Sequence, residues 1–160
     1  MRKDKEGMLR DFNTGWKMSL YFLWKLPTII FYGIRIREVT IDHCRVSIAY
    51  RWRTKNPFRS IYAGAQFAAA EISTGLLAKL AIQGRGRISM LITHVEMEYT
   101  KKATALTTFA CADGSRFDKA IDEMLITGES QVVEARSTGT METGEVVSVM
   151  KFTWSFMLKE

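Results

Sequence analysis

Residues 61–82 read IYAGAQFAAAEISTGLLAKLAI, and this stretch decides the fold. We expect it to form one long helix, which at 1.5 Å per residue spans about 30 Å. Its small side chains are Ala63, Gly64, Ala65, Ala68, Ala69, Ala70, Ser73, Gly75, Ala78 and Ala81. Because small residues let neighbouring backbones approach closely, we expect a sheet to wrap around this helix rather than to lie loosely on it.

The segments on either side of this helix alternate with a period of two, which predicts strands. In residues 44–52, the side chains of Cys44, Val46, Ile48, Tyr50 and Trp52 share one face. The expected strands cover residues 34–41, 44–52, 87–99, 103–112, 131–141 and 145–158, with a turn at residues 42–43. A short helix is expected over residues 115–127, with its N-cap at residue 115. This order predicts an α+β fold, an antiparallel sheet around one central helix.

The N-terminal segment is the most apolar part of the chain, and residues 18–34 read MSLYFLWKLPTIIFYGI. A membrane span needs about 20 predominantly apolar residues, whereas Lys25 divides this stretch and Pro27 would break a helix. A secretory signal fits poorly, because acidic residues mix with the first basic ones and no A-x-A-like cleavage site follows. We therefore expect an amphipathic helix over residues 8–24, followed by a second short apolar segment.

Four bulky residues of that expected helix recur at helical spacing: Trp16, Leu20, Leu23 and Trp24. Such a stripe suits either docking on a core or lying on a membrane surface, and we favour docking on the core. The chain then divides into an N-terminal helical extension, residues 1–32, and a main unit, residues 33–160. Together they make one domain, as the length of 160 residues suggests.

Composition narrows the class of protein further. Hydrophobic residues make up 47% and charged residues 25% of the chain, which excludes disordered and collagen-like classes. The two cysteines, Cys44 and Cys111, lie in apolar segments, so we expect buried free thiols and a reducing, cytoplasmic location. The net charge of +6 suits an anionic partner. Because the basic residues are scattered and no nucleic-acid motif occurs, we favour a small phosphorylated ligand over nucleic acid.

Motifs for metal or redox chemistry are absent from the sequence, and neither His43 nor His94 has a second ligand at the usual spacing. His94, Glu96 and Glu98 would share one side of a strand, where they could hold a metal or transfer protons. A solvated strand face is the interpretation that we favour. We expect neither a metal nor a bound cofactor.

The start of the long helix carries the chemical signal, and residues 56–71 read NPFRSIYAGAQFAAAE. Asn56 precedes the helix, the small pair Ala63 and Gly64 lies in its first turn, and Glu71 is a lone carboxylate two turns further on. Free backbone amides and the positive end of the dipole make a helix N-terminus a natural site for an oxyanion or a phosphate. From composition alone, we favour the simpler interpretation that Glu71 faces solvent or pairs with a surface lysine or arginine.

These residues resemble the signature of hotdog-fold acyl-CoA thioesterases of the phenylacetic-acid-degradation type, N-x-x-G-x-x-H-G-G-x-x-x-x-x-x-D. Asn56 falls on its asparagine, Tyr62 on its histidine, Ala63 and Gly64 on its two glycines, and Glu71 on its acid. Residues 95–103, VEMEYTKKA, are similar to the family's strand that ends in an aromatic, a basic residue and a small turn. The extra N-terminal helix, the tyrosine and the glutamate bring the chain closer to the thioesterase-like DUF4442 branch.

The resemblance covers residues 33–158 and implies a hotdog fold, with active sites at the interface of a homodimer or of a tetramer. It implies that the backbone amides of Ala63 and Gly64 polarise a thioester carbonyl. Glu71 of the other subunit would activate water or attack directly, and Asn56 would hold the water or the loop. Tyr62, in the histidine position, would contact the substrate. The expected activity is hydrolysis of an acyl-CoA or a related thioester, with coenzyme A as part of the substrate.

Four basic residues near strand ends could meet the phosphates of the coenzyme: Arg85, Arg87, Lys101 and Lys102. Two other functions stay open at this point. One is a hotdog protein that binds acyl groups or coenzyme A without turnover. The other is a protein held on a membrane surface by residues 8–34, which we do not favour.

Overall fold

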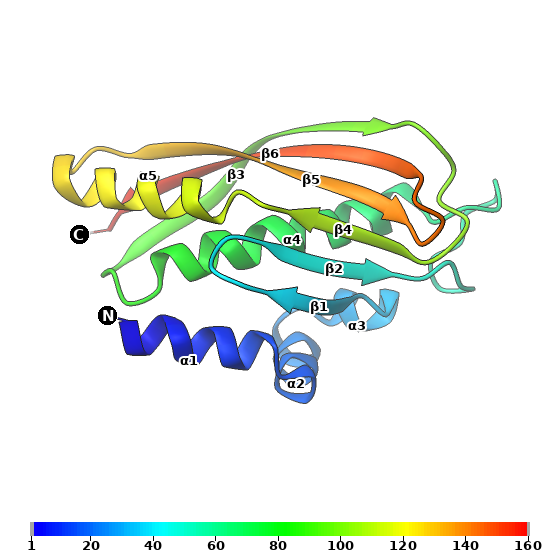
Figure 1. Ribbon diagram of the computed structural model, residues 1–160, viewed down its shortest axis with the longest axis horizontal. Coiled ribbons are helices and arrows are strands. Elements are labelled where there is room, and N and C mark those ends of the chain that lie inside the picture. Colours follow the sequence, from blue (N-terminus) through cyan, green and yellow to red (C-terminus); the bar gives the residue numbers. More distant parts are fainter. Residues whose placement is uncertain (1, 160) are drawn as a thin grey trace.

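The computed structural model describes residues 2–159, in which one sheet of six antiparallel strands wraps around a long helix (Figure 1). The strands are β1 (Arg35–Val39), β2 (Cys44–Ile48), β3 (Ile88–Tyr99), β4 (Thr107–Cys111), β5 (Gln131–Met141) and β6 (Val146–Leu158), in the order β1-β2-β4-β5-β6-β3. The wrapped helix is α4 (Ala63–Ile82), as the small side chains of that stretch predict. The predicted α+β hotdog architecture is confirmed.

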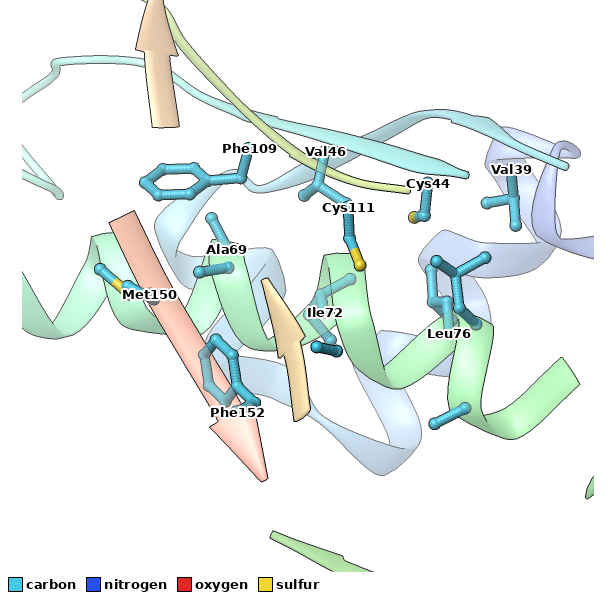
Figure 2. Packing of buried hydrophobic residues seen from close by; sticks show 14 of the residues in the cluster. Val39, Cys44, Val46, Ala69, Ile72, Leu76, Phe109, Cys111, Met150 and Phe152 are labelled. Carbon is cyan, nitrogen blue, oxygen red and sulfur yellow. The ribbon is translucent and has the colours of Figure 1, made fainter. Parts of the chain in front are cut away.

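The core lies between α4 and the concave face of the sheet. Phe109, Met150 and Phe152 are fully buried there and lie around the part of α4 that carries Ala69 (Figure 2). An alanine at this position leaves room for the large sheet side chains at close-packed density. The small side chains of α4 therefore complement the large side chains that the sheet directs at this helix.

Three hydrogen bonds join buried side chains of α4 to side chains of the sheet. The Ser148 hydroxyl donates to Gln66 Oε1 (3.1 Å), Ser73 Oγ contacts Ser137 Oγ (2.7 Å), and Trp154 Nε1 donates to Thr74 Oγ1 (3.1 Å). The Gln66 amide also donates to the carbonyl of Ile61 (3.0 Å). The buried polar side chains that α4 directs at the sheet are thus paired, as a stable core requires.

The two cysteines are opposite each other in the pairing of β2 with β4, and both are buried free thiols, as predicted. Burial raises the pKa of Cys111 to about 12 and raises that of Cys44 as well. Because the thiolate is the reactive form, neither side chain is a nucleophile at neutral pH.

The single helix predicted over residues 8–24 is wrong in one respect, because two helices occupy this segment: α1 (Arg2–Phe12) and α2 (Gly15–Lys25). Between them, the Asn13 side chain accepts from the amide of Val39 (2.9 Å) and donates to its carbonyl (2.8 Å). This contact ties the chain to the edge strand β1 and stops the first helix. The second apolar segment is α3 (Pro27–Tyr32), which has its proline at the helix start, where the missing amide costs nothing.

The expectation that Trp16, Leu20, Leu23 and Trp24 pack on the core is also wrong, since all four are exposed, Trp24 by 83%. The side chains of α2 that do enter the core are Met18 and Phe22, on the opposite side of the helix. Periodicity assigns residues to one face but does not say what that face contacts. No helix among residues 2–159 is long and apolar enough to cross a membrane.

Several element boundaries differ from the prediction, and local hydrogen bonds explain the early end of β2. β2 ends at Ile48, since the Thr54 hydroxyl donates to the carbonyl of Ala49 (2.7 Å) and accepts from the amide of Arg51 (2.9 Å). Trp52 is consequently exposed instead of continuing the buried face. The second helix of the main unit, α5 (Gly114–Thr127), begins one residue before the predicted N-cap, Ser115.

Gly114 packs directly under the β1–β2 turn. Its amide donates to the carbonyl of Asp42 (3.0 Å). A Cβ at this position would lie 2.0 Å from the carbonyl oxygen of Ile41 and 2.7 Å from Cα of Asp42. Only a glycine allows the start of α5 to approach the turn this closely.

Candidate active site

The loop between β2 and α4 is held by Asn56. Its side-chain oxygen accepts from the amides of Phe58 (3.0 Å) and Ser60 (3.1 Å), and its side-chain nitrogen donates to Ser60 Oγ (3.1 Å). Of the two roles that the resemblance implies for Asn56, the geometry favours holding the loop. Arg59 adopts a φ of +62°, and it stands where the quoted signature has glycine. The backbone is therefore in the left-handed conformation at this point of the loop, although the residue is not a glycine.

The first turn of α4 presents unpaired backbone donors. Within the described part of the chain, the amides of Ala63 and Gly64 have no acceptor, as expected at a helix start. Tyr62, the N-cap residue, lies with its ring against Gly64, where a Cβ would come within 2.6 Å of Tyr62 Cε1. Gly64 thus provides the space that the ring occupies beside these amides.

Tyr99, at the end of β3, is a site residue that the sequence analysis did not select. Its hydroxyl donates to the carbonyl of Ala63 (3.1 Å), which ties the end of β3 to the helix start. Burial, and then the neighbouring Tyr62, raise the pKa of Tyr99, so the hydroxyl keeps its proton at neutral pH. The sequence shows only an aromatic residue at a strand end, because its proximity to α4 arises from the wrapping of the sheet.

Glu71 lies on a partly exposed stripe of α4, which we call the open stripe and which consists of Gly64, Phe67, Ala68, Glu71, Gly75 and Lys79. Their spacing of three and four residues places them on one side of the helix. No side chain among residues 5–159 forms a hydrogen bond or an ion pair with the Glu71 carboxylate. Burial raises the pKa of this carboxyl group, because the charged form is poorly solvated there.

The predicted basic residues fall into two groups at opposite ends of α4. Lys101 and Lys102 follow β3 close to the helix start, since the neighbouring Ala103 carbonyl accepts from the amide of Ile61 (2.8 Å). Arg85 and Arg87 follow the other end of the helix, about 30 Å away for a helix of 20 residues.

Carboxylate partners are seen for Arg85 and Lys101. The Arg85 guanidinium is nearly buried and forms ion pairs with Asp118 (3.3 Å) and Asp122 (2.6 Å). Lys101 pairs with Glu145 (2.6 Å), which lowers the pKa of that glutamate. Lys101 and Lys102, the basic residues at the helix start, are both exposed.

The outer face of β3 carries His94, Glu96 and Glu98. Glu96 forms an ion pair with Lys151 of β6 (2.9 Å), and this hydrogen bond lowers the pKa of Glu96. Among the described residues, no group of three His, Cys, Asp or Glu side chains could hold a metal ion.

The wrapped helix and the sheet order define a hotdog-fold protein, and solved structures of this kind resemble the chain. A probable thioesterase of unknown function from Pseudomonas aeruginosa is 18% identical, with a TM-score of 0.76 over 95% of this chain and 94% of that one. A thioesterase from Haemophilus influenzae is 17% identical, with a TM-score of 0.67 over 88% and 90%. The PaaI protein of the phenylacetic acid degradation operon of E. coli is 10% identical, with a TM-score of 0.63 over 92% and 94%.

Residues 14–156 match the family described as domain of unknown function DUF4442, and the chain belongs to this family. No curated protein matches the sequence.

Proposed function

We propose that the protein is a homodimeric acyl-CoA thioesterase, with each site made from the helix start of one subunit and Glu71 of the other. The observation that supports this proposal is that α4 carries both free backbone amides and a carboxylate. The helix start offers unpaired amides that can donate hydrogen bonds to an oxyanion, and the open stripe offers a carboxylate with a raised pKa that no side chain among residues 5–159 pairs with. Hydrolysis of a thioester needs both.

The reaction follows from these two groups. The thioester carbonyl oxygen binds at the amides of Ala63 and Gly64, and the Glu71 carboxylate takes a proton from a water molecule. The resulting hydroxide adds to the carbonyl carbon, and the negative charge that develops on the oxygen is stabilised by donors that need no reorganisation. The C–S bond then breaks, and Glu71 returns the proton to the departing sulfur, leaving a carboxylic acid and a free thiol.

Glu71 cannot serve the helix start of its own chain. It lies eight residues after Ala63, which corresponds to about 12 Å along the helix axis. A second copy must therefore supply the carboxylate, so activity depends on the dimer.

The free edge of the sheet is the surface that we propose for this dimer. β3 is an edge strand of 12 residues, and its outward-facing Leu91 is 64% exposed. Met97 and Tyr99 face the helix side of the sheet and are still exposed, which leaves room for another chain beside the helix start. A long free edge with apolar side chains is a template for pairing with a second strand.

Light scattering at micromolar concentration should give a mass about twice the 18.3 kDa of the chain. Leu91→Glu places a charge on the proposed interface and should shift the mass to that of the monomer with loss of thioesterase activity. Ile126→Glu, at a side chain of α5 that is 84% exposed, is the matched control and should leave the dimer intact. A monomeric parent protein would exclude the shared site.

Thiol release from acyl-CoAs of short, medium and long chain tests the activity itself. We expect hydrolysis of at least one length, with kcat near or above about 1 s⁻¹, at the low end of typical enzymes. The position of the Tyr62 ring against Gly64 favours one alternative, which is binding of an acyl-CoA without turnover. Binding of an acyl-CoA with no thiol release would establish that alternative instead.

A further inference from the structure

The exposed side of α2 is an apolar feature that the proposed active site does not use. Trp16, Leu20, Leu23 and Trp24 are exposed along this helix, and Leu26 and Phe31 continue the apolar surface onto α3. We call these six residues the apolar surface. Large exposed apolar patches of this kind mark contact with a protein or with a membrane.

A strongly basic cavity lies beside the apolar surface. Arg35 and Arg37 of β1, with Arg51 and Arg53 of the loop after β2, line a cavity of about 300 Å³ that no carboxylate lines. Among the residues that the structure describes, none of these four arginines forms an ion pair with a carboxylate. We call them the arginine cluster.

The apolar surface and the arginine cluster meet at α3. The ring of Phe31, in the apolar surface, lies 5.8 Å from the ring of Tyr32, which lines the cavity of the arginine cluster. Arg35, Arg37 and Arg53 also line a larger cavity of about 580 Å³ together with Met18 and Phe22, which lie on the side of α2 opposite the apolar surface. Figure 1 shows α1, α2 and α3 grouped at the β1 side of the sheet, with α2 lowest.

The charge of this region identifies the occupant. Between Asp11 and Glu38 the sequence contains no acidic residue, whereas it contains Lys17, Lys25, Arg35 and Arg37. A second copy of the same surface would bring these like charges together, which opposes self-association. An anionic bilayer offers both an apolar interior and the phosphates that arginine binds in bidentate fashion.

We propose that this surface docks on an anionic phospholipid bilayer, with α2 lying in the interface and the arginine cluster at the level of the lipid phosphates. The 11 residues of α2 are about 16 Å long, half of the hydrocarbon thickness, so the helix lies along the membrane. Tryptophan favours this boundary because one end of its ring is apolar and the other donates a hydrogen bond. The proposal does not depend on thioesterase activity.

Docking is compatible with the proposed dimer. β1 and β3 are the two edges of the sheet, with β2, β4, β5 and β6 between them. Pairing through β3 therefore leaves the β1 side, which carries the arginine cluster, free for the bilayer.

Sedimentation of the full chain with two kinds of vesicle tests the proposal. We expect binding to vesicles of phosphatidylcholine mixed with phosphatidylglycerol, and little binding to pure phosphatidylcholine. Leu20→Glu combined with Trp24→Glu should abolish the binding. Arg51→Gln combined with Arg53→Gln should weaken it by about 10- to 30-fold, the effect of two basic side chains near an anionic surface. Lys119→Gln combined with Lys159→Gln removes the same charge elsewhere and should weaken it much less.

Tryptophan fluorescence gives a second readout, which begins with the parent protein. On addition of the anionic vesicles, the fluorescence of Trp16 and Trp24 should shift to shorter wavelength, and the shift should persist in Trp52→Phe and vanish in Trp16→Phe combined with Trp24→Phe. Failure of the parent protein to bind anionic vesicles would overturn the proposal. So would a change in mass on light scattering caused by Leu20→Glu with Trp24→Glu, since the surface would then be a contact between protein chains. Stabilisation by inorganic phosphate without vesicle binding would assign the arginine cluster to a soluble anion instead.

Discussion

Glu71→Gln should lower kcat for thioester hydrolysis by about 10²- to 10⁴-fold, the usual contribution of a general base. The amide keeps the size and shape of the carboxyl group but cannot accept a proton from water. The dimer should persist, because the side chain has no partner to lose among residues 5–159. Steady-state thiol release with the acyl-CoA that the parent hydrolyses best provides the measurement.

Glu129→Gln, on the exposed turn after α5, is the control with the same chemical change and should hydrolyse as the parent does. If Glu71→Gln retained the parental rate, the carboxylate would have no part in the chemistry.

The pH dependence gives the same assignment a second check. Burial raises the pKa of Glu71 from its ordinary value of 4.5, and the base works only when it is ionised. Activity should therefore rise with pH through that raised pKa, and Glu71→Gln should lose this limb of the profile.

Stability should move in the opposite direction to activity. A carboxyl group with a raised pKa in the folded chain favours folding when protonated, below its unfolded value of 4.5, and this contribution is lost as the pH rises through the folded pKa. At pH 7 the ionised side chain opposes folding, so Glu71→Gln should raise Tm there. The gain should disappear below pH 4.5.

Gly114→Ala should destabilise the protein by about 3 kcal/mol, at the upper end of what inserting one methyl group into a packed site costs. The added Cβ would lie 2.0 Å from a backbone carbonyl oxygen and 2.7 Å from a backbone Cα, neither of which can rotate away. Either α5 or the β1–β2 turn must move. For a domain of this size, the expected fall in Tm is about 6–12 °C.

Gly7→Ala is the matched control, since Gly7 also lies in a helix and a Cβ there meets nothing within 4 Å. It should stabilise the chain slightly, by about 0.5–1 kcal/mol, because alanine is the better helix former. Thermal unfolding followed by circular dichroism compares the two variants. Equal melting temperatures would show that the turn and α5 do not pack as closely as described.

The sequence predicts the sheet and the central helix well because both are local patterns. Alternation along residues 131–141 matches β5, and the small residues of 61–82 match α4. Local patterns do not predict that the helix ends after α1, because this end depends on Asn13 binding the backbone of a strand residue that is 26 positions away in the sequence. The exposed face of α2 escapes it for a related reason: helical spacing groups four bulky residues without showing that Met18 and Phe22 are the ones that meet the core.

The candidate site divides in the same way. The motif places Asn56, Ala63, Gly64 and Glu71 in sequence; Ala63 and Gly64 lie at the helix start, and Asn56 holds the loop that leads to it. Tyr99 reaches that point only through the fold, as a strand end that is 36 residues from its hydrogen-bond acceptor. The ion pairs of Arg85 are likewise set by the packing of α5, which no local pattern shows.

The three side-chain hydrogen bonds between α4 and the sheet bear on the orientation of Glu71. A helix composed largely of alanine, glycine, leucine and isoleucine has apolar side chains on every side, so hydrophobic burial alone fixes its rotation about its own axis only weakly. The hydrogen bonds between the sheet and Gln66, Ser73 and Thr74 do fix it, because each of these side chains meets its partner at only one angular setting. Moving the helix by one residue in register would turn it by about 100° and carry the carboxylate from the open stripe into the sheet. The rotation of α4 and the stability of the core are therefore set by different interactions. Replacement of a single buried hydroxyl can change the rotation of the helix while the apolar packing stays the same.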